Sequence, residues 1–401
     1  MTRNDPEVLL APATAPIWQA AEAMSEPNPA AVTRLRRDNP DVPAEVISAI
    51  ITQSVLRRRG RQQLGSVADR LLFTTAGLQQ CTRPVVAARR AQLLVDKGVT
   101  SVRDLGCGIG LDSLAFLNAG MSVIPVERDQ DTAKIARINL GVPVVVADAT
   151  DAGLPQTDAT FIDPARRDGE QRTLNPNQWS PSWRWVTDYA AHQPMTVAKA
   201  APGLPHVNIP HDATAEWISV SGQLVETCVW FSGLSANQPR RRAVLLTQGE
   251  DPWQPASIQE LSNDDAPEPA PLGELNDWIV EPDPAIIRSH LIDVLAARIG
   301  AVGLSPGIAY LTMNTPPVES WGQLFQVLAT VPAGGKALRL ELRRRGIGKL
   351  EVHTRGLGID PTRLRKSLRL SGKGPVHHLL LTRLAGTPCG FLVDPQQRKS
   401  H

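Results

Sequence analysis

The feature that most constrains the fold is a short apolar segment that runs directly into a row of alternating glycines. The segment is VTSVRDLGCGIG, Val99 to Gly110, and a helix-like segment, LDSLAFLNAG, follows it. This form is typical of a first parallel strand that turns tightly into a helix, because glycines let backbone amides approach an adenosine-containing ligand. Glycine-rich turns also serve purely as turns, so the glycine spacing alone is weak evidence. The rest of the chain makes the interpretation specific.

Strand and helix signals alternate after this turn. Apolar, β-branched runs occupy 121–126, 143–147, 159–162 and 195–198, with helix-like segments between most of them. Such alternation predicts βαβ units and a parallel sheet with helices on both faces. After Pro210 the strand-like runs follow one another without helices, which predicts antiparallel strands that complete the edge of the sheet.

The length and the uneven charge predict several modules. A chain of 401 residues is too long for one ordinary core. The net charge is only +2, but 243–287 contains no Lys or Arg against ten acids, whereas 336–401 contains fifteen Lys and Arg against four acids. We therefore predict four parts, namely a helical segment over 1–97, an α/β domain over 98–248, an acidic Pro-rich linker over 249–274 and a smaller basic α/β domain over 275–397.

The spacing of the cysteines and the length of the apolar runs indicate in which compartment of the cell the protein lies. The four cysteines are far apart and form no C-x-x-C pair, so we expect neither a zinc site nor a disulfide framework and assign no metal ligands. The N-terminus does not have the form of a secretory signal, and no run of 18 apolar residues occurs. We expect a cytoplasmic protein without a membrane partner.

Four acids fall at the carboxyl ends of successive predicted strands, where an open α/β sheet binds its ligands. Asp104 ends the first strand, and Glu127 ends the second, where a carboxylate can accept both hydroxyl protons of a ribose. Asp148 ends the third and is positioned to accept a proton of the adenine amine. Asp163 ends the fourth, and Pro164 after it fixes the backbone. Four such acids together are much more specific than any one alone.

With these residues the segment 99–231 resembles the class I S-adenosylmethionine-dependent methyltransferases. The resemblance implies a Rossmann-like seven-stranded sheet and S-adenosylmethionine as cofactor. In that family the turn that matches Asp104 to Gly110 holds the methionine part, and the acids that match Glu127 and Asp148 hold the ribose and the adenine. The cofactor-binding residues that we expect are Asp104, Gly106, Cys107, Gly108, Gly110, Asp112, Glu127, Asp148 and Ala149.

Further segments resemble a narrower, actinobacterial-type group of methyltransferases with a C-terminal THUMP-like domain. They include LLFTTAGLQQCTRPVVAARRA, FIDPARRD, VAKAAPGLPH and WIVEPDPAIIRSHL, so the resemblance covers most of the chain. THUMP domains recognise tRNA, and membership therefore implies an RNA substrate. The basic residues of 343–373 agree with this, since a continuous basic stripe would contact phosphates, whereas side chains scattered over all faces would only solubilise the domain.

The acceptor site is expected around Asp163, Pro164 and Arg166. The related branches have Asp/Asn-Pro-Pro and then an aromatic residue, but here Ala165 replaces the second proline and Arg166 replaces the aromatic residue. Asp163 and the Pro164 carbonyl could still accept hydrogen bonds from a target nitrogen. They need little strength as bases, because orientation supplies most of the rate. A stacking ring would have to come from elsewhere.

Several roles in this region stay open. Trp183 is our candidate for stacking on a base, although tryptophan clusters more often serve packing. Arg166 and Arg167 could bind a substrate phosphate or pair with nearby acids. Asp112 could reach the methionine amino group or cap a helix. We do not expect Cys107 to act as a nucleophile.

The sequence thus predicts an enzyme that transfers a methyl group from S-adenosylmethionine to a nitrogen of an RNA base, with tRNA as the preferred partner through the basic C-terminal domain. Two alternatives remain: a methyltransferase that acts on a small molecule or a protein, and a non-catalytic RNA-binding protein that retains S-adenosylmethionine.

Overall fold

The computed structural model describes residues 6–24, 26–151, 153–165, 167–168, 171–172, 175–193, 195–235, 238–263 and 269–396. The chain divides into two compact units. The first comprises Met1–Thr214, Thr227–Asn237 and Leu246–Ile258, and the second comprises Ala215–Glu226, Gln238–Leu245 and Gln259–His401. Among the described residues, no helix combines the length and the apolar character that crossing a membrane requires.

The predicted N-terminal helical segment is present. Its elements are η1 (Pro6–Leu10), η2 (Pro12–Thr14), α1 (Ala15–Ala23), α2 (Pro29–Asp38), α3 (Ala44–Leu64), η3 (Gly65–Arg70), α4 (Thr75–Gln80) and α5 (Pro84–Asp96). Prolines occupy the first turns of α2 and α5, where a missing N–H costs nothing, and the Asn28 side chain caps α2. α1 and α3 pack through Ile17, Ile47 and Ile50, whose side chains are fully buried.

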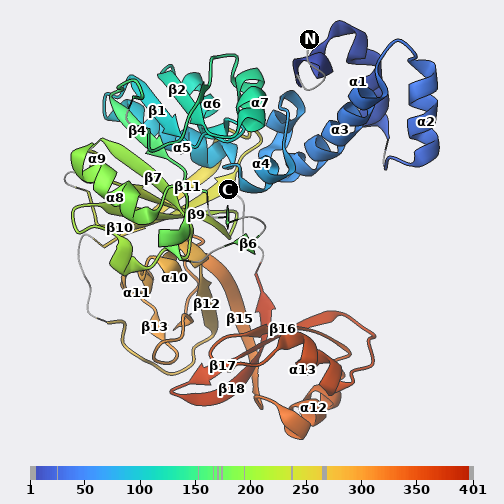
Figure 1. Ribbon diagram of the computed structural model, residues 1–401. Helices are drawn as coiled ribbons and strands as arrows, with labels where there is room; N and C mark the ends of the chain where they lie inside the picture. The colour runs from blue at the N-terminus through green and yellow to red at the C-terminus, as the bar shows by residue number, and fades with distance from the viewer. Residues whose placement is uncertain are drawn as a thin grey trace. The chain divides into compact units, whose positions relative to one another are not determined.

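The next part is a doubly wound α/β arrangement (Figure 1). Its parallel strands are β1 (Ser101–Leu105), β2 (Ser122–Glu127), β3 (Val145–Val146), β4 (Ala159–Ile162) and β7 (Thr196–Ala200). The helices that alternate with them are α6 (Leu111–Asn118), α7 (Gln130–Leu140) and α8 (Trp183–His192). β1 lies between β2 and β4, so the carboxyl ends of these central strands meet at one edge of the sheet.

The sheet continues beyond β7 with strands that follow one another closely in sequence. They are β9 (Gln223–Trp230), which is antiparallel to β7, and then β8 (Thr214–Val220), β10 (Arg241–Gln248) and β11 (Pro255–Ser262). The order of the sheet is β11-β10-β8-β9-β7-β4-β1-β2-β3. Short connecting elements are β5 (Arg167–Asp168) paired with β6 (Gln171–Arg172), η4 (Pro176–Gln178), η5 (His206–Asn208) and α9 (Ser232–Ser235).

Two predictions need correction here. The sheet has nine strands rather than seven, because β10 and β11 extend it. β11 also lies inside the stretch 249–274 that we interpreted as a linker, and it pairs with β10 at the edge of the sheet. The acidic and Pro-rich composition hid this strand.

The C-terminal sheet has seven strands in the order β13-β14-β12-β15-β18-β17-β16. They are β12 (Trp278–Pro282), β13 (Val302–Gly303), β14 (Leu311–Met313), β15 (Gly322–Val331), β16 (Lys349–Thr354), β17 (Val376–Leu384) and β18 (Thr387–Pro395). β16 and β17 are parallel, and the other neighbours that we resolve are antiparallel.

The helices of this part are α10 (Pro284–Arg288), α11 (Ile292–Ile299), α12 (Gly335–Arg344) and α13 (Pro361–Leu368). α10 and α11 are separate helices, because His290 between them adopts a φ of 57° and interrupts the helical run. α12 and α13 cover the same face of the sheet, since Leu338 and Leu342 of one and Leu368 of the other share a core with Val352 and Leu379.

Candidate active site

The turn after β1 requires its glycines. Gly106, Gly108 and Gly110 have φ values of +85°, +56° and +95°, a region that favours glycine. A Cβ on Gly106 would also lie 2.8 Å from the backbone oxygen of Asp163, and one on Gly110 would lie 2.9 Å from the Leu140 side chain. The glycines therefore let β1, β4 and α7 approach one another closely at this edge of the sheet.

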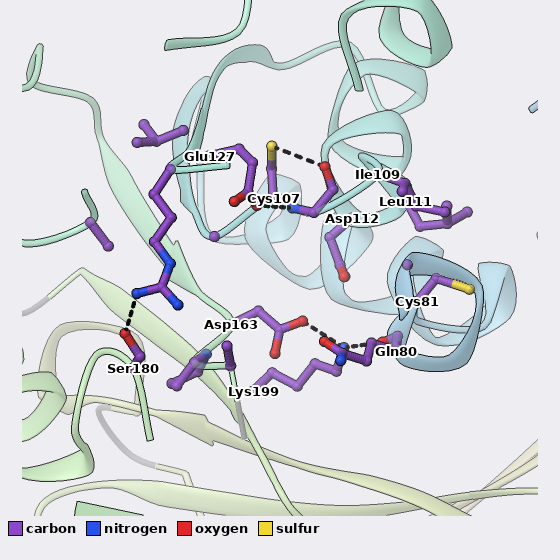
Figure 2. Close-up of a pocket in the computed structure, with 18 of the residues that line it drawn as sticks. Gln80, Cys81, Cys107, Ile109, Leu111, Asp112, Glu127, Asp163, Ser180 and Lys199 are labelled. Carbon is purple, nitrogen blue, oxygen red and sulfur yellow. Dashed lines mark hydrogen bonds and ion pairs between the residues drawn. The ribbon is translucent and has the colours of Figure 1, made fainter. Parts of the chain in front are cut away.

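A cavity opens at the carboxyl ends of β1, β2, β3, β4 and β7, where the sequence predicted a ligand site (Figure 2). Its lining brings together most of the expected residues. From the predicted set it contains Gly106, Cys107, Gly108, Asp112, Glu127, Asp148, Ala149, Asp163 and Pro164. It also contains residues of the corner between α4 and α5, namely Gln80, Cys81 and Thr82.

Asp104 and Gly110 are not among the described residues that line this cavity. The Asp104 side chain is fully buried beneath the turn, where Ser113 Oγ donates a hydrogen bond to Asp104 Oδ2 at 2.5 Å. Burial, with the nearby charge of Asp112, raises the pKa of Asp104 to about 8, so this carboxyl is protonated at neutral pH. The expectation that four carboxylates converge on one pocket thus holds for three of them.

Glu127 and Asp148 present ionisable oxygens to the cavity. The Glu127 carboxylate accepts hydrogen bonds from the backbone N–H of Gly108 at 3.1 Å and of Asp129 at 2.9 Å, which fixes its orientation. Asp148 accepts hydrogen bonds from the hydroxyl and the backbone N–H of Thr150, and these bonds hold the pKa of Asp148 below its usual value. Both carboxylates are suited to accept hydrogen bonds from a sugar or a base.

Asp163 forms an ion pair with a residue that the sequence analysis did not select. Lys199, at the end of β7, lies with its Nζ 2.7 Å from Asp163 Oδ2 and also donates to Thr82 Oγ1 at 2.9 Å and to the Gln80 carbonyl at 3.3 Å. Figure 2 shows the Asp163, Lys199 and Gln80 side of the cavity. A lysine within the apolar strand TVAKA was the available signal, because a charge in a buried strand needs a partner.

The network continues to the cofactor turn. Thr82 Oγ1 donates to Asp112 Oδ2 at 2.6 Å, and Arg90 of α5 forms a buried ion pair with Asp112 Oδ1. Asp112 therefore does not cap α6, which was one of its two open roles. Its carboxylate lines the cavity while two residues of the α4 to α5 region hold it.

The segment after Asp163 is only partly described. Arg166 lies outside the described residues, and Arg167 is described only as part of β5, so their predicted roles stay predictions. Ala165 forms a backbone bridge with Ser180, and Ser180 Oγ accepts a hydrogen bond from Arg128 at 2.9 Å. Arg128 is a second cationic residue of the cavity that sequence reasoning missed, because it follows Glu127 in a polar run.

Trp183 does not fit the stacking role that we considered for it. Its side chain is buried, packs edge-on against Trp179 and donates from Nε1 to the Asn208 carbonyl at 2.9 Å. It is also not among the described residues that line the cavity. The ring is part of the core, so a base-stacking residue has to come from elsewhere.

Cys107 is a cavity residue but a poor nucleophile. Burial raises the pKa of its thiol well above the usual value, so the thiolate is scarce at neutral pH. This agrees with the expectation that it takes no covalent part.

Nine basic residues of the C-terminal part are exposed, and most belong to one layer. We call them the basic set: Arg343, Arg344, Arg345, Lys349, Arg363, Arg365, Lys366, Arg369 and Lys373. Most lie on or next to α12 and α13, which cover the same sheet face. Glu341 pairs with two of them, Arg344 and Arg345, at 2.7 Å each, and these bonds lower the pKa of Glu341 to about 2.

Comparison with known proteins agrees with this architecture. A family described as THUMP domain-like matches residues 322–395. Two proteins of Mycobacterium tuberculosis, from strains CDC 1551 / Oshkosh and H37Rv, are each 32% identical over 347 residues, which is 84% of this chain and 92% of the relative. Both are named uncharacterized S-adenosylmethionine-dependent methyltransferases.

A crystal structure of a candidate methyltransferase from Porphyromonas gingivalis W83 has the same fold. It superposes with a TM-score of 0.75 at 19% identity and covers 100% of both chains. At this identity the similarity shows the fold alone.

The fold and the cavity define a Rossmann-like α/β protein of the methyltransferase class, joined to a THUMP-like domain. By its identity to the M. tuberculosis proteins, the chain belongs to their family of S-adenosylmethionine-dependent methyltransferases. The protein is thus an enzyme that uses S-adenosylmethionine, and the resemblance stated from the sequence is confirmed.

Proposed function

We propose that the protein methylates a nitrogen of an RNA base, with tRNA as its preferred substrate, in the cytoplasm. The observation that carries this proposal is the position of Asp163. Its carboxylate lines the same cavity as Glu127 and Asp148, so an acceptor bound by Asp163 would lie beside a nucleoside bound by the other two.

The chemistry of the lining fits S-adenosylmethionine. Glu127 would accept hydrogen bonds from the ribose hydroxyls, and Asp148 would accept one from the adenine amine. Asp112 and the turn after β1 would hold the methionine part. When bound, the cofactor supplies an activated methyl group on a positively charged sulfur. These three carboxylates and that of Asp163 would offset the charge, because they are the acidic groups among the described lining residues.

The protein's part in the reaction is to orient the acceptor. Asp163 and the Pro164 carbonyl would accept hydrogen bonds from the target base and fix the position of its reacting nitrogen in the cavity. The Asp163 side chain is 29% exposed, which leaves it accessible to a base that enters the cavity. Orientation of this kind supplies a large share of the rate.

The basic set supports RNA as the substrate. Its side chains are exposed, and most lie on one layer of the THUMP-like domain, so they could contact several phosphates at once. Binding through such contacts weakens steeply as salt is raised. A small molecule or a protein acceptor would leave this charge without a role.

The test compares nucleosides from total tRNA and total rRNA of strains with and without the protein by mass spectrometry. We expect one N-methylated base to disappear without the protein and to return with the wild-type chain. Asp163→Ala should not restore it, although calorimetry should show that this variant still binds S-adenosylhomocysteine. Asp188→Ala, a change of an exposed acid on α8, is the matched control and should restore the product.

Identical nucleoside profiles in the two strains, and no methylation of either RNA by the purified protein, would refute the RNA proposal and favour the small-molecule or protein alternative. Full product formation by Asp163→Ala would refute the role of Asp163 instead.

A further inference from the structure

The acceptor side of the cavity carries a fixed cation beside its carboxylate. Lys199 Nζ lies 2.7 Å from Asp163 Oδ2, and both residues line the cavity (Figure 2). The Lys199 side chain is only 10% exposed, against 29% for Asp163. A molecule that binds to Asp163 Oδ1 would therefore meet the ammonium as its neighbour.

The ammonium is held in place by groups of the α4 to α5 corner. Thr82 Oγ1 and the Gln80 carbonyl accept hydrogen bonds from it at 2.9 and 3.3 Å. Thr82 is itself bound to Asp112, so the lysine belongs to a network of buried and polar side chains rather than to a mobile surface arm. The network therefore fixes the position of the Lys199 amino group at the acceptor site.

Such a cation acts in opposite ways on the two kinds of RNA base nitrogen that carry hydrogen, the exocyclic amine and the lactam nitrogen. An exocyclic amine, as in adenine or cytosine, reacts through a lone pair that is conjugated with the ring. A cation that bonds to the adjacent ring nitrogen draws this lone pair into the ring and makes the amine a poorer nucleophile. Asp163 next to Lys199 is therefore badly matched to an amine.

A lactam nitrogen, as N1 of guanine or N3 of uracil, loses its proton when it is methylated, and negative charge moves onto the neighbouring carbonyl oxygen. An ammonium that donates to this oxygen stabilises the developing charge, while a carboxylate beside it accepts the N–H proton. A lactam presents its N–H and its C=O side by side, as an adjacent carboxylate and ammonium require.

We propose that Asp163 and Lys199 together select an acceptor whose N–H lies beside a carbonyl group that takes up the developing negative charge, which among RNA base nitrogens is the lactam N–H of guanine or uracil. This inference rests on the proposed function and narrows it to a substrate class. An ammonium has three N–H donors, and in the structure they bond to Asp163, Thr82 and Gln80. Lys199 is then a catalytic residue that exchanges its bond to Asp163 for one to the acceptor carbonyl and keeps its bonds to Thr82 and Gln80.

The step balances without any further reactant. The acceptor nitrogen forms its bond to the methyl carbon while the carbon–sulfur bond breaks and its electron pair stays on sulfur. The N–H proton passes to Asp163, which releases it to water after the product leaves. Lys199 keeps its protons throughout.

The first test is the identity of the methylated nucleoside. RNA from the strain that lacks the protein is incubated with purified full-length enzyme and S-adenosylmethionine, and its nucleosides are analysed by mass spectrometry against standards. We expect N1-methylguanosine or N3-methyluridine. A product methylated on an exocyclic amine, on N1 of adenine or on carbon would overturn the inference, although RNA methylation itself would stand.

The remaining outcomes bear on the proposed function itself. A 2′-O-methylated ribose would refute a base nitrogen as the target, and the inference with it, although RNA would stand as the substrate. If no RNA were methylated, the proposed function and the inference would fall together.

The second test removes the cation. Lys199→Met should lower kcat at neutral pH by about a hundredfold or more, as the loss of one charge-stabilising donor does in other enzymes. Raising the pH toward the ionisation of the base N–H should recover much of this loss, because an already deprotonated base no longer needs the ammonium. Lys199→Arg should retain more activity than Lys199→Met, and Lys134→Met on the surface of α7 is the matched control.

S-adenosylhomocysteine binding, measured by calorimetry, shows whether each variant has folded. A Lys199→Met enzyme that binds this ligand and keeps wild-type kcat, or whose deficit is equal at every pH, would overturn the role of Lys199. Should Lys199→Met fail to fold, the comparison of Lys199→Arg with wild type across pH and the product identity still decide the question.

Discussion

A test of the turn after β1 follows from the protonated carboxyl beneath it. Asp104 is fully buried, and its pKa is raised from 3.8 to about 8, chiefly by burial and then by the charge of Asp112, while Ser113 and Arg90 act in the opposite direction. Between these two pH values the unfolded chain carries an ionised Asp104 and the folded chain a neutral one. Below pH 3.8 Asp104 is protonated in both states and costs no stability. As the pH rises from 3.8 to about 8, the folded state holds a proton that the unfolded chain has lost, so the free energy of unfolding falls.

The size of the effect follows from linkage. Each pH unit in this window costs about 1.4 kcal/mol of stability, so at pH 7 the total is on the order of 4 kcal/mol relative to the acidic limit. Asp104→Asn removes the titrating group and can still accept the hydrogen bond from Ser113. The stability of the variant relative to wild type should therefore rise by about 1.4 kcal/mol per pH unit from pH 5 to pH 8.

The assay is urea or thermal unfolding of both proteins at several pH values, and the quantity of interest is the slope of their difference. In thermal unfolding this slope is about 4 °C per pH unit for a unit of roughly 200 residues. Asp158→Asn is the control, because hydrogen bonds from Thr100 and Ser101 lower the pKa of Asp158 and keep it outside the window. A flat difference between Asp104→Asn and wild type from pH 5 to pH 8 would refute the reasoning.

Three further predictions concern the cavity. Glu127→Gln should weaken S-adenosylhomocysteine binding about tenfold in calorimetry, because a charge-assisted hydrogen bond is worth about 1.5 kcal/mol more than none; unchanged affinity would exclude Glu127 from the ribose site. Trp183→Phe should lower the free energy of unfolding by about 1 kcal/mol through loss of its bond to Asn208 and leave KM for RNA unchanged; a raised KM in a stable variant would restore a stacking role. Cys107→Ser should keep kcat within about twofold in a radiolabelled methyl-transfer assay, since its raised pKa leaves little thiolate; loss of turnover with intact cofactor binding would contradict this.

The sequence predicted much of the fold because its strongest signals are local. The run into Gly106 is a strand and then a turn by its own chemistry, and the order of strand and helix up to β7 follows from periodicity. Local signals also bound two helices of the C-terminal part, since α13 begins at Pro361 after the capping residue Asp360 and α12 ends shortly before Gly346. β11 was missed because its composition resembles that of a linker.

The cavity was predictable only in part, because burial and pairing are not local. Glu127, Asp148 and Asp163 could be found from strand ends, whereas nothing in the sequence distinguished them from Asp104, whose position one layer deeper depends on packing. The bond between Asp163 and Lys199 joins residues 36 positions apart. Periodicity carries no information on such a pair.

The corner between α4 and α5 extends the catalytic domain upstream of its predicted boundary. Gln80 and Thr82 lie upstream of the boundary at residue 97 that the sequence suggested, yet they hold Lys199, and Arg90 holds Asp112. A fragment that begins at residue 98 would keep the three glycines of the turn after β1 and every cavity carboxylate. It would lose Gln80 and Thr82 as partners of Lys199, and Thr82 and Arg90 as partners of Asp112. Residues 80–90 therefore form part of the wall of this cavity, and we expect an active fragment to include α4 and α5.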